Sequence, residues 1–353
     1  MEKERYSRQT AIPTFGNSGQ QALHESRVLV IGAGGLGSPV LLYLAAAGVG
    51  TLGIVESDQV DLSNLQRQIL YTTSDVGQDK LTQTTQRLLD LNPTIQVRPF
   101  PTRFTSANAM EIASEFDLVV DASDNLPTRY LVNDTCHLLG IPWIYGAIYR
   151  FEGQVAVFNH QKGIDYRDLF PSPPPPELTP NCATAGVLGV MAGLIGTLQA
   201  TEAVKVLTGL GTPLDGELLL VDTLTQDFRK LKIPAEPNRP DIHSLIDYEA
   251  FCGLSTPEIT WNQYQNSSSA YFLLDVRETW EHEEEHIGGF SIPLDELEER
   301  LAEIPTEKPV LVHCLGGTRS AQAVQILKNR RPHQTFLSLQ NGLRGVPEEA
   351  FIR

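Results

Sequence analysis

Two stretches of this chain combine glycines with residue types that could bind an anion or carry out chemistry. The first is Gly32-Ala-Gly34-Gly35-Leu-Gly37, and the second is His313-Cys-Leu-Gly-Gly-Thr-Arg-Ser320. Glycines let backbone N–H groups approach an anion closely, and the N-terminus of a following helix adds partial positive charge. The first stretch therefore predicts a site for nucleotide phosphates. The second predicts a cysteine at the mouth of an anion-binding loop.

Charged residues downstream of the first stretch indicate which reaction the nucleotide would serve. Glu56 could accept hydrogen bonds from a ribose, and Asp124 could hold Mg²⁺ through its carboxylate. Arg67 and Lys80 are cations suited to a triphosphate. Attack of a carboxylate on the α-phosphate of ATP needs such cations, whereas hydride transfer does not. The glycine spacing alone would equally suit an NAD-dependent dehydrogenase, which is the alternative at this point.

The elements expected around these residues alternate between strands and helices. Strands are predicted over residues 27–31, 51–55 and 117–120, with a helix over 38–47 and another starting at Lys80. This order predicts an α/β fold with a doubly wound, mostly parallel, Rossmann-like sheet. Open sheets of this kind bind ligands outside the carboxyl ends of their strands, where the charged residues named above are expected.

The C-terminal part of the chain repeats this pattern on a smaller scale. Residues 271–275 and 309–313 are predicted strands and residues 320–328 a helix, which indicates a second, smaller α/β unit. Its glycine-rich loop would favour the thiolate or persulfide form of Cys314, with Arg319 as a fixed positive charge. Cysteine phosphatases use a similar loop, so cleavage of a phosphate ester is the alternative chemistry.

Four separated motifs resemble the MoeB/ThiF adenylyltransferases, which are relatives of ubiquitin-activating enzymes. They are the first glycine-rich stretch, Ser63-Asn-Leu-Gln-Arg-Gln68, Lys80 and Asp121-Ala-Ser-Asp-Asn125, all within residues 5–232. The resemblance implies ATP and Mg²⁺ as cofactors. It implies as substrate the C-terminal Gly-Gly carboxylate of a ubiquitin-like sulfur carrier protein.

The same resemblance assigns roles to individual residues. Arg8 matches an arginine that in this family reaches the partner subunit's nucleotide, which implies a homodimer. Asp124 is placed near the magnesium ion. Together with the glycine spacing, the resemblance predicts an ATP-binding set made of Gly32, Gly34, Gly35, Gly37, Glu56, Ser63, Asn64, Leu65, Gln66, Arg67, Lys80, Asp124 and Asn125. The predicted catalytic residues are Arg8, Arg67, Lys80, Asp124, Cys182 and Cys314.

Three segments before Cys314 are similar to the signatures of rhodanese domains. They are Leu273-Leu-Asp-Val-Arg-Glu278, His286-Ile-Gly-Gly289 and Ile292-Pro-Leu294, within residues 256–353. The resemblance implies a persulfide on Cys314, loaded from a cysteine desulfurase or thiosulfate. The alternatives are a non-sulfurating adenylyltransferase and a docking scaffold with an inactive rhodanese domain. The pair of domains is the arrangement of MoeZ-type fusion proteins, which implies production of a thiocarboxylate for molybdopterin, thiamine or thiolated tRNA synthesis.

The four cysteines of the chain stand alone, with no Cys-x-x-Cys pair. The adenylyltransferase family usually carries two such pairs that bind structural zinc. Here Asp165-Tyr-Arg-Asp168 stands in place of the first, and Arg239-Pro-Asp-Ile242 lies near the second. Carboxylates without partners are poor zinc ligands, so no structural zinc is predicted. Isolated thiols also favour a reducing, cytoplasmic location.

Cys182 is the cysteine of the first half with a reactive setting. It precedes a helix punctuated by glycines, and a helix N-terminus can activate a thiol. By resemblance, this cysteine meets the activated carrier or its sulfur donor. Cys136 and Cys252 have no such setting and are predicted to be packing residues.

Composition and proline-rich breaks set limits on the whole chain. Its 353 residues include 43 acidic residues against 27 Lys and Arg, and this excess of acid argues against nucleic-acid binding. The breaks predict an adenylyltransferase domain over residues 1–233, a linker over 234–256 and a rhodanese domain over 257–353.

Residues 183–200 and 281–285 stand out by composition, the first as an apolar run and the second as an acidic run. Residues 183–200 are apolar but run directly into Glu202 and Lys205, so a buried helix is expected and no membrane span. The acidic run 281–285 is expected to be a solvated face.

Overall fold

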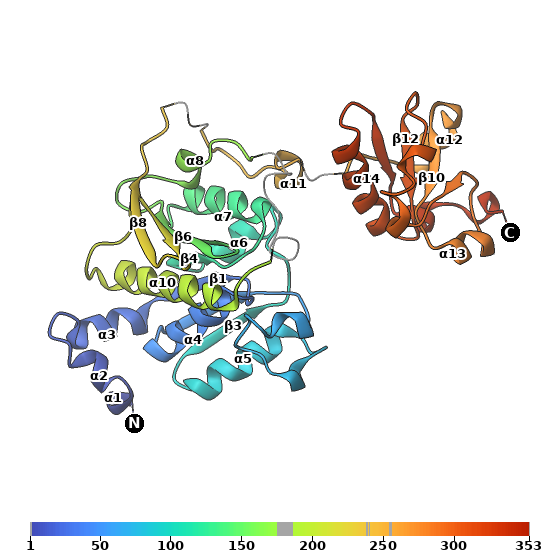
Figure 1. Ribbon diagram of the computed structural model, residues 1–353. Coiled ribbons are helices and arrows are strands. Elements are labelled where there is room, and N and C mark those ends of the chain that lie inside the picture. Colours follow the sequence, from blue (N-terminus) through green and yellow to red (C-terminus); the bar gives the residue numbers. More distant parts are fainter. Residues whose placement is uncertain (1, 175–185, 238, 240, 254–255, 353) are drawn as a thin grey trace. The chain divides into compact units, whose positions relative to one another are not determined.

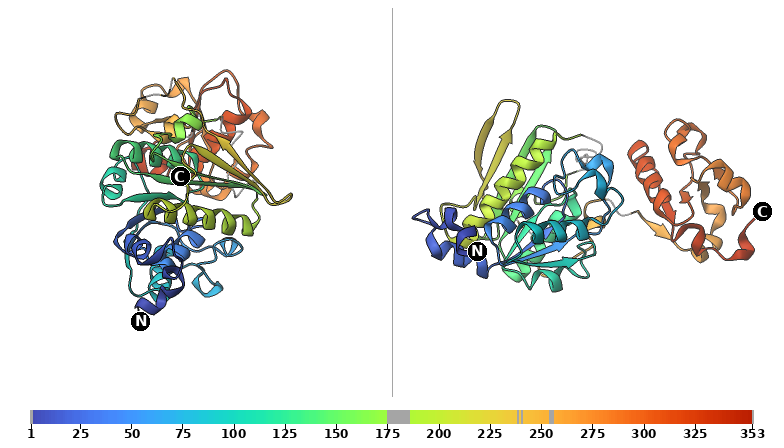
Figure 2. Two further views of the ribbon diagram at one scale, coloured as in Figure 1. Left: turned by 90° about the vertical axis from the view of Figure 1, so that its left-hand side faces the viewer. Right: turned by 90° about the horizontal axis from the view of Figure 1, so that it is seen from below.

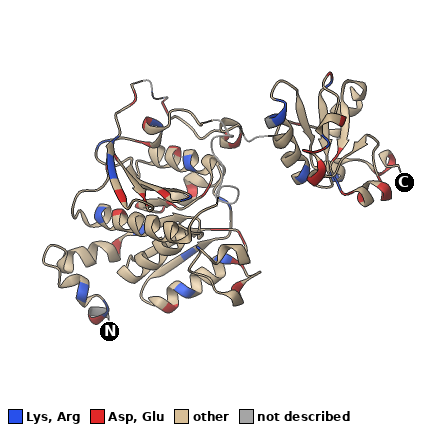
Figure 3. Ribbon diagram, in the orientation of Figure 1, with Lys and Arg blue, Asp and Glu red and all other residues tan. Residues whose placement is uncertain are grey.

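The computed structural model describes residues 2–174, 186–237, 239, 241–253 and 256–352, which form two compact units (Figure 1). The first unit comprises residues 1–252 and the second residues 253–353. Acidic and basic residues are interspersed along the chain in both units (Figure 3). Both units are α/β, and each has its own sheet and core.

The first unit is built on an eight-stranded sheet with the order β3-β2-β1-β4-β5-β6-β7-β8. Strands β1 to β5 pair in parallel, and β6, β7 and β8 continue the sheet as an antiparallel meander. The chain runs outward from β1 to β3 and returns on the other side of β1 as β4, so a topological switch point lies between β1 and β4. The strands are β1 (Arg27–Ile31), β2 (Thr51–Val55), β3 (Gln96–Phe100), β4 (Leu118–Asp121), β5 (Trp143–Tyr149), β6 (Glu152–Phe158), β7 (Glu217–Asp222) and β8 (Asp227–Lys232).

Helices cover both faces of this sheet (Figures 1 and 2). One core cluster joins the sheet to α3, α4, α5 and α10, and the other joins it to α6, α7, α8 and α11. The predicted doubly wound, mostly parallel fold is therefore confirmed. The helices are α1 (Glu2–Arg5), α2 (Ser7–Thr10), α3 (Gly16–Glu25), α4 (Gly37–Ala47), α5 (Lys80–Leu91), α6 (Ala109–Ala113), α7 (Leu126–Leu139), α8 (Tyr166–Leu169), α10 (Gly189–Thr208) and α11 (Tyr248–Phe251).

Local sequence explains where several of these elements begin and end. Asp79 caps α5 and Asn125 caps α7, each by accepting a hydrogen bond from a backbone N–H of the first turn. Helix α4 ends at Gly48, whose φ of 84° is left-handed. The predicted strands 27–31 and 51–55 coincide with β1 and β2.

Helix α10 is long and apolar enough to cross a membrane by length and composition alone. It packs against α4 and against strands β5 and β6. Its buried residues include Met191, Ile195 and Gln199. This is the packing of a helix in the core of the unit, and the first residues of the predicted span 183–200 lie outside the described residues.

The predicted linker, residues 234–256, contains helix α11, which packs against α7. The Tyr248 hydroxyl donates a hydrogen bond to Asp134 Oδ2 at 2.8 Å, and Cys252 is buried in the same cluster. The compact part of the first unit thus extends to Cys252.

The second unit has a five-stranded parallel sheet with the order β11-β10-β12-β13-β9. Its strands are β9 (Glu258–Ile259), β10 (Phe272–Asp275), β11 (Phe290–Ser291), β12 (Val310–His313) and β13 (Phe336–Leu339). Its helices are α12 (Trp261–Gln265), α13 (Thr279–Glu284) and α14 (Thr318–Arg330), with the 3-10 turn η7 (Gly342–Gly345). The predicted smaller α/β unit is therefore confirmed.

Candidate active sites

The turn between β1 and α4 lies at the switch point of the first sheet. Gly32 has a φ of +95°, and a Cβ on it would lie 3.1 Å from the carbonyl oxygen of Ala122, just after β4. A Cβ on Gly37 would collide with the carbonyl oxygen of Gly32. The turn therefore requires glycine at both positions. Helix α4 begins at Gly37, so its N-terminus brings partial positive charge to this edge of the sheet.

Glu56 and Tyr71 hold this turn in place. Glu56 Oε2 accepts a hydrogen bond from the N–H of Ala33 at 3.0 Å. Its Oε1 accepts from the N–H groups of Ser57 and Asp58 at 2.8 and 2.9 Å. The Tyr71 hydroxyl donates to the carbonyl oxygen of Ala33 at 2.8 Å, and burial raises the pKa of Tyr71, so the hydroxyl keeps its proton. The turn is thus anchored to the carboxyl end of β2.

The segment 63–68 lies beside the same turn. Arg67 donates a hydrogen bond to the carbonyl oxygen of Ser63 at 3.0 Å, and its Cγ lies 3.4 Å from where a Cβ on Gly35 would stand. Gln68 Nε2 lies 3.6 Å from the corresponding position on Gly34. The structure therefore brings Arg67 onto the glycine-rich turn. The predicted residues Asn64, Leu65 and Gln66 complete this segment.

Lys80 is the first residue of α5 and is only 5% exposed. Its Nζ lies 3.4 Å from Asp58 Oδ2, on a side chain that is itself 63% exposed. A buried ammonium paired at this distance with a solvated carboxylate is poorly compensated. The charge of Lys80 is therefore suited to meeting an anion bound at this edge of the sheet.

Asp121 ends β4 as a fully buried carboxylate. Its Oδ1 accepts a hydrogen bond from the N–H of Ser123 at 2.9 Å, and its Oδ2 lies 4.0 Å from Arg129 Nε. Burial raises the pKa of Asp121, and the charge of Arg129 opposes that effect. Gln199 of α10 donates to the carbonyl oxygen of Asp121 at 2.7 Å. These contacts hold the carboxyl end of β4 in place.

Asp124 and Asn125 follow β4 directly and are exposed. They lie at the same edge as the glycine-rich turn, because Ile31 of β1 is in register with Asp121 of β4. Within the described residues, no three His, Cys, Asp or Glu side chains gather as metal ligands. A magnesium ion held by one carboxylate and nucleotide phosphates needs no such cluster, so Asp124 fits that role.

Two predicted residues are not brought to this edge by the described contacts. Arg8 is exposed on α2, in the N-terminal helical segment α1 to α3 (Figure 1). Cys182 lies outside the described residues.

The second site is the loop between β12 and α14. Cys314 is 2% exposed, and its Sγ accepts hydrogen bonds from the N–H groups of Gly317 at 3.2 Å and Ser320 at 3.4 Å. Gly317 has a φ of +95°, which suits glycine and turns its N–H toward the sulfur. Two backbone donors on one sulfur stabilise negative charge there.

A buried carboxylate lies beside this loop. Asp275, at the end of β10, accepts hydrogen bonds from Arg277, the shortest at 2.7 Å, and lies 2.9 Å from His282 Nδ1. Burial alone would raise the pKa of Asp275, but the hydrogen bonds from Arg277 outweigh it and the pKa lies below its usual value. His313 Nδ1 lies 3.8 Å from Asp275, and burial lowers the pKa of His313 to about 4. His313 is therefore neutral at ordinary pH.

Arg319 does not stand free over the cysteine. Its guanidinium donates to both carboxylate oxygens of Glu281 on α13, at 2.5 and 2.9 Å. The hydrogen bonds from Arg319 lower the pKa of Glu281, whose side chain is only 14% exposed. The expectation that 281–285 is a solvated face is therefore wrong at Glu281, since its cationic partner stands far along the chain.

Comparison with known proteins covers both units. Residues 6–241 match the ThiF family, and residues 256–348 match the rhodanese-like domain. The chain belongs to the ThiF family. A sulfur carrier protein adenylyltransferase of Thermus thermophilus is 54% identical over 264 residues, which cover 72% of this chain and 97% of the relative. A probable adenylyltransferase/sulfurtransferase MoeZ of Mycobacterium tuberculosis is 42% identical over 361 residues, 97% of this chain and 92% of the relative.

This ThiF-family chain is an adenylyltransferase and sulfurtransferase. The dehydrogenase and phosphatase alternatives therefore do not apply. A crystal structure of E. coli MccB with MccA-N7isoASN matches with a TM-score of 0.60 and 19% identity, over 72% of this chain and 75% of that one. That likeness shows the shared fold of the first unit.

Ion pairs fill the region where zinc-binding cysteines are usual in the ThiF family. Asp165 is the N-cap of α8 and Asp168 is the third residue of that helix, and the two form a capping box. Arg239 Nη1 lies 2.6 Å from Asp168 Oδ2 and 3.2 Å from Asp165 Oδ2. His137 Nδ1 lies 3.4 Å from Asp165 Oδ2. The carboxylates at these positions are thus contacted by the guanidinium of Arg239 and the imidazole of His137, which come from two distant segments.

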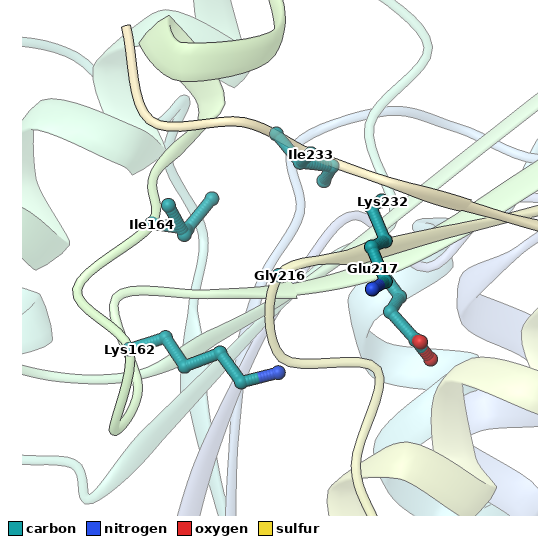
Figure 4. Close-up of a pocket in the computed structure, with 6 residues that line it drawn as sticks. All are labelled: Lys162, Ile164, Gly216, Glu217, Lys232 and Ile233. Atoms are coloured by element: carbon teal, nitrogen blue, oxygen red, sulfur yellow. The ribbon is translucent and has the colours of Figure 1, made fainter. Parts of the chain in front are cut away.

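A cavity of about 290 Å³ lies at the edge of the first sheet opposite the glycine-rich turn, and Figure 4 shows the residues that line it. Strand β6 ends at Phe158, which is in register with Trp143, the first residue of the parallel strand β5. The cavity therefore lies at the edge where the parallel strands begin. Lys162 Nζ there donates to the carbonyl oxygen of Asp215 at 2.6 Å. This placement separates the cavity from the carboxyl edge where the predicted nucleotide residues lie. Its lining is Lys162, Ile164, Gly216, Glu217, Lys232 and Ile233.

Sequence reasoning did not single out Tyr71, Arg129 or Gln199 as site residues. Gln199 carried a weak signal, because it is a polar residue within an otherwise apolar helix. Tyr71 and Arg129 carried none, since their contacts with Ala33 and Asp121 depend on the fold.

Proposed function

We propose that the chain adenylates the C-terminal glycine of a ubiquitin-like sulfur carrier protein and then converts it to a thiocarboxylate. The observation that carries the proposal is the presence in one chain of a glycine-rich nucleotide turn and a cysteine held by backbone N–H donors. The 54% identity to a sulfur carrier protein adenylyltransferase of Thermus thermophilus supports the carrier as substrate.

In the first step, an oxygen of the carrier's carboxylate attacks the α-phosphorus of ATP. The bond to pyrophosphate breaks, pyrophosphate leaves, and an acyl adenylate forms. The glycine-rich turn and the N-terminus of α4 would bind phosphate oxygens, while Arg67 and Lys80 would neutralise charge that grows in the transition state. Asp124 would hold Mg²⁺, which offsets phosphate charge when bound.

In the second step, the terminal sulfur of a Cys314 persulfide attacks the acyl carbon and AMP leaves. The carrier is then joined to Cys314 through an acyl disulfide. A thiolate, Cys182 in this proposal, attacks the Cys314 sulfur and releases the carrier as a thiocarboxylate. The resulting disulfide between the two cysteines is reduced by an external thiol. The N–H donors of Gly317 and Ser320 support the charged sulfur in this step.

We propose a homodimer in which Arg8 reaches the nucleotide of the partner subunit. The sulfur donor is a cysteine desulfurase or thiosulfate, and the location is the cytoplasm. The thiocarboxylate would serve molybdopterin, thiamine or thiolated tRNA synthesis.

The test is intact-mass measurement of candidate carriers ending in Gly-Gly after incubation with the full chain, ATP, Mg²⁺ and thiosulfate. The expected product has gained one sulfur in place of one oxygen. Carrier-dependent exchange of labelled pyrophosphate into ATP measures the first step separately. Failure of every carrier to support that exchange would overturn the proposal.

Cys314→Ala separates the two steps. We expect it to abolish formation of the thiocarboxylate while pyrophosphate exchange continues at the normal rate, because Cys314 takes no part in adenylation. Cys252→Ala is the matched control, since that thiol is also buried and its pKa is raised to about 12, chiefly by burial. Normal thiocarboxylate production by Cys314→Ala would refute the assignment of the sulfur site.

A further inference from the structure

The 3-10 turn η7 (Gly342–Gly345) is docked against the loop that carries Cys314. The N–H of Leu343 donates to the carbonyl oxygen of Cys314 at 2.8 Å, and the N–H of Arg344 donates to that of Leu315 at 3.1 Å. A Cβ on Gly342 would collide with the carbonyl oxygen of Cys314, so the turn cannot approach this closely without glycine there. The position of Arg344 relative to the cysteine loop is therefore set by the backbone.

The guanidinium of Arg344 lies over Gly316 of the cysteine loop. A Cβ on Gly316 would stand 3.7 Å from Arg344 Nη1, 3.8 Å from Cζ and 3.9 Å from Nε. These nearly equal distances show that the plane of the guanidinium, and not its edge, faces Gly316. Arg344 is exposed. Within the described residues, no ion pair and no side-chain hydrogen bond engages it.

Arg319, the cation within the loop itself, is differently placed. Both of its terminal nitrogens are used by Glu281, so its charge is matched by a carboxylate at hydrogen-bond distance. An anion approaching the sulfur would have to compete with that carboxylate for Arg319. It would meet no such competition at Arg344.

We propose that Arg344 is the anion-recognition residue of the Cys314 site, binding an oxyanion group carried by the molecule that exchanges sulfur with this cysteine. This inference rests on the proposed role of Cys314. It goes beyond that role by naming the recognising residue and the chemical class of its ligand. The shared chemistry is a tetrahedral oxyanion adjacent to the reacting atom, which a planar guanidinium binds with two parallel hydrogen bonds.

Two molecules in the reaction could supply that oxyanion. During loading, the Cys314 thiolate attacks the outer sulfur of thiosulfate, the S–S bond of thiosulfate breaks, and sulfite leaves with its electron pair; Arg344 would bind the sulfonate oxygens. During transfer, the persulfide attacks the acyl adenylate and AMP leaves; Arg344 would bind the phosphate. The experiment must separate these sources.

The deciding measurement compares alkylation of Cys314 by iodoacetate, an anion, with alkylation by iodoacetamide, its neutral analogue, read by mass spectrometry of the Cys314 peptide. Arg344→Gln should lower the iodoacetate-to-iodoacetamide rate ratio about tenfold, the weight of a charge-assisted hydrogen bond. Arg344→Lys should retain most of the ratio, because the charge remains. The matched control is Arg330→Gln at the end of α14, which removes an exposed arginine roughly 18 Å along that helix.

Two kinetic measurements, the two arms of the experiment, then identify which molecule supplies the oxyanion. One arm measures KM and kcat for thiocyanate formation from thiosulfate and cyanide, where loss of sulfonate binding raises KM about tenfold with little change in kcat. The other measures single-turnover sulfur transfer from preloaded protein to an isolated acyl adenylate. An effect of Arg344→Gln in the first arm identifies the sulfonate of thiosulfate as the oxyanion that Arg344 binds. An effect in the second arm identifies the phosphate of the acyl adenylate.

An unchanged alkylation ratio in Arg344→Gln overturns the proposal, as does a wild-type rate in both kinetic arms. Circular dichroism and thermal unfolding confirm that the variant is folded. If no carrier is adenylated, the proposed function fails, but the alkylation ratio and the thiosulfate arm still test Arg344. The two failures are therefore distinguishable.

Discussion

Arg239 and Asp168 are 71 residues apart in the chain, and their charged groups approach to 2.6 Å. The same guanidinium donates to the carbonyl oxygen of Gly163 at 3.3 Å, and the second oxygen of Asp168 accepts the N–H of Glu236 at 2.8 Å. Asp168 thus ties the segment around α8 to the chain that leads toward α11. In the ThiF family this region usually depends on zinc, and here a set of charged side chains joins the same two segments.

Removing Arg239 should destabilise the first unit. Arg239→Gln leaves two nearly buried carboxylates, Asp165 and Asp168, without their cation, and breaking a buried pair in this way costs about 3 kcal/mol. Urea unfolding of the full chain measures the change. Arg229→Gln is the control, because Arg229 is exposed, its partner Asp227 is partly exposed, and such a surface pair is worth less than about 1 kcal/mol. Equal stabilities of the two variants would contradict the role given to Arg239.

Metal removal should affect activity and leave stability unchanged. The region around α8 is held by ion pairs, so we expect a zinc chelator to leave the thermal unfolding temperature as it was. Excess EDTA should instead stop pyrophosphate exchange, because the proposed site at Asp124 needs Mg²⁺. Stoichiometric zinc in purified protein, measured by elemental analysis, would contradict the first expectation. Exchange that continues in EDTA would contradict the second.

The second unit should lose stability as the pH falls toward the pKa of His313. Burial lowers that pKa from 6.5 to about 4, so between these values the unfolded chain binds a proton that the folded chain does not. The contribution of His313 to the free energy of unfolding is therefore fully present above the unfolded pKa and declines as the pH drops. A tenfold change in proton affinity corresponds to about 1.4 kcal/mol, so the total loss is about 3 kcal/mol. The pKa of Asp275 is also lowered, which adds a further loss in the same direction below its usual value of 3.8.

Pulse proteolysis in urea at several pH values, with fragments of the second unit identified by mass, measures this dependence. The control is His313→Gln, which cannot titrate. The quantity to compare is the slope of the free energy of unfolding against pH. In His313→Gln this slope should flatten between about pH 6.5 and 4. If the wild-type slope persisted in His313→Gln, another group would be responsible.

Local patterns were sufficient to predict the elements that position both sites. Strands β1 and β2, the start of α5 at Lys80 and the strand before Cys314 follow from runs of apolar residues and from glycines. The glycine requirement at Gly32 and Gly37 likewise follows from the spacing of the motif, because the backbone must turn sharply between a strand and a helix.

Contacts between distant segments could not be predicted in this way. Gln199 reaches the carbonyl oxygen of Asp121 across 78 residues, and Arg319 reaches Glu281 across 38. Hydrophobic periodicity records which face of an element is buried, but it does not record which polar group will be opposite. The acidic run at 281–285 therefore looked solvated, although one of its carboxylates is held by the arginine of the sulfur loop.

Gly37, the first residue of α4, closely approaches the carbonyl oxygen of Gly32 at the start of the nucleotide turn. Gly37→Ala should lower carrier-dependent pyrophosphate exchange and destabilise the first unit by about 1–3 kcal/mol, because its Cβ would press on the carbonyl oxygen of Gly32 and force the turn to shift. Gly193→Ala is the matched control. It makes the same change within α10, where a Cβ meets nothing within 4 Å among the described residues.

Alanine favours a helix interior over glycine by about 1 kcal/mol, so Gly193→Ala should keep its exchange activity and be at least as stable as the wild type. Gly37→Ala should therefore lower both the free energy of unfolding and the exchange activity, whereas Gly193→Ala should lower neither, although each adds one methyl group. A Gly37→Ala protein that binds ATP and exchanges pyrophosphate normally would show that the turn tolerates a side chain. The phosphate site would then have to be sought elsewhere along the carboxyl edge of the sheet.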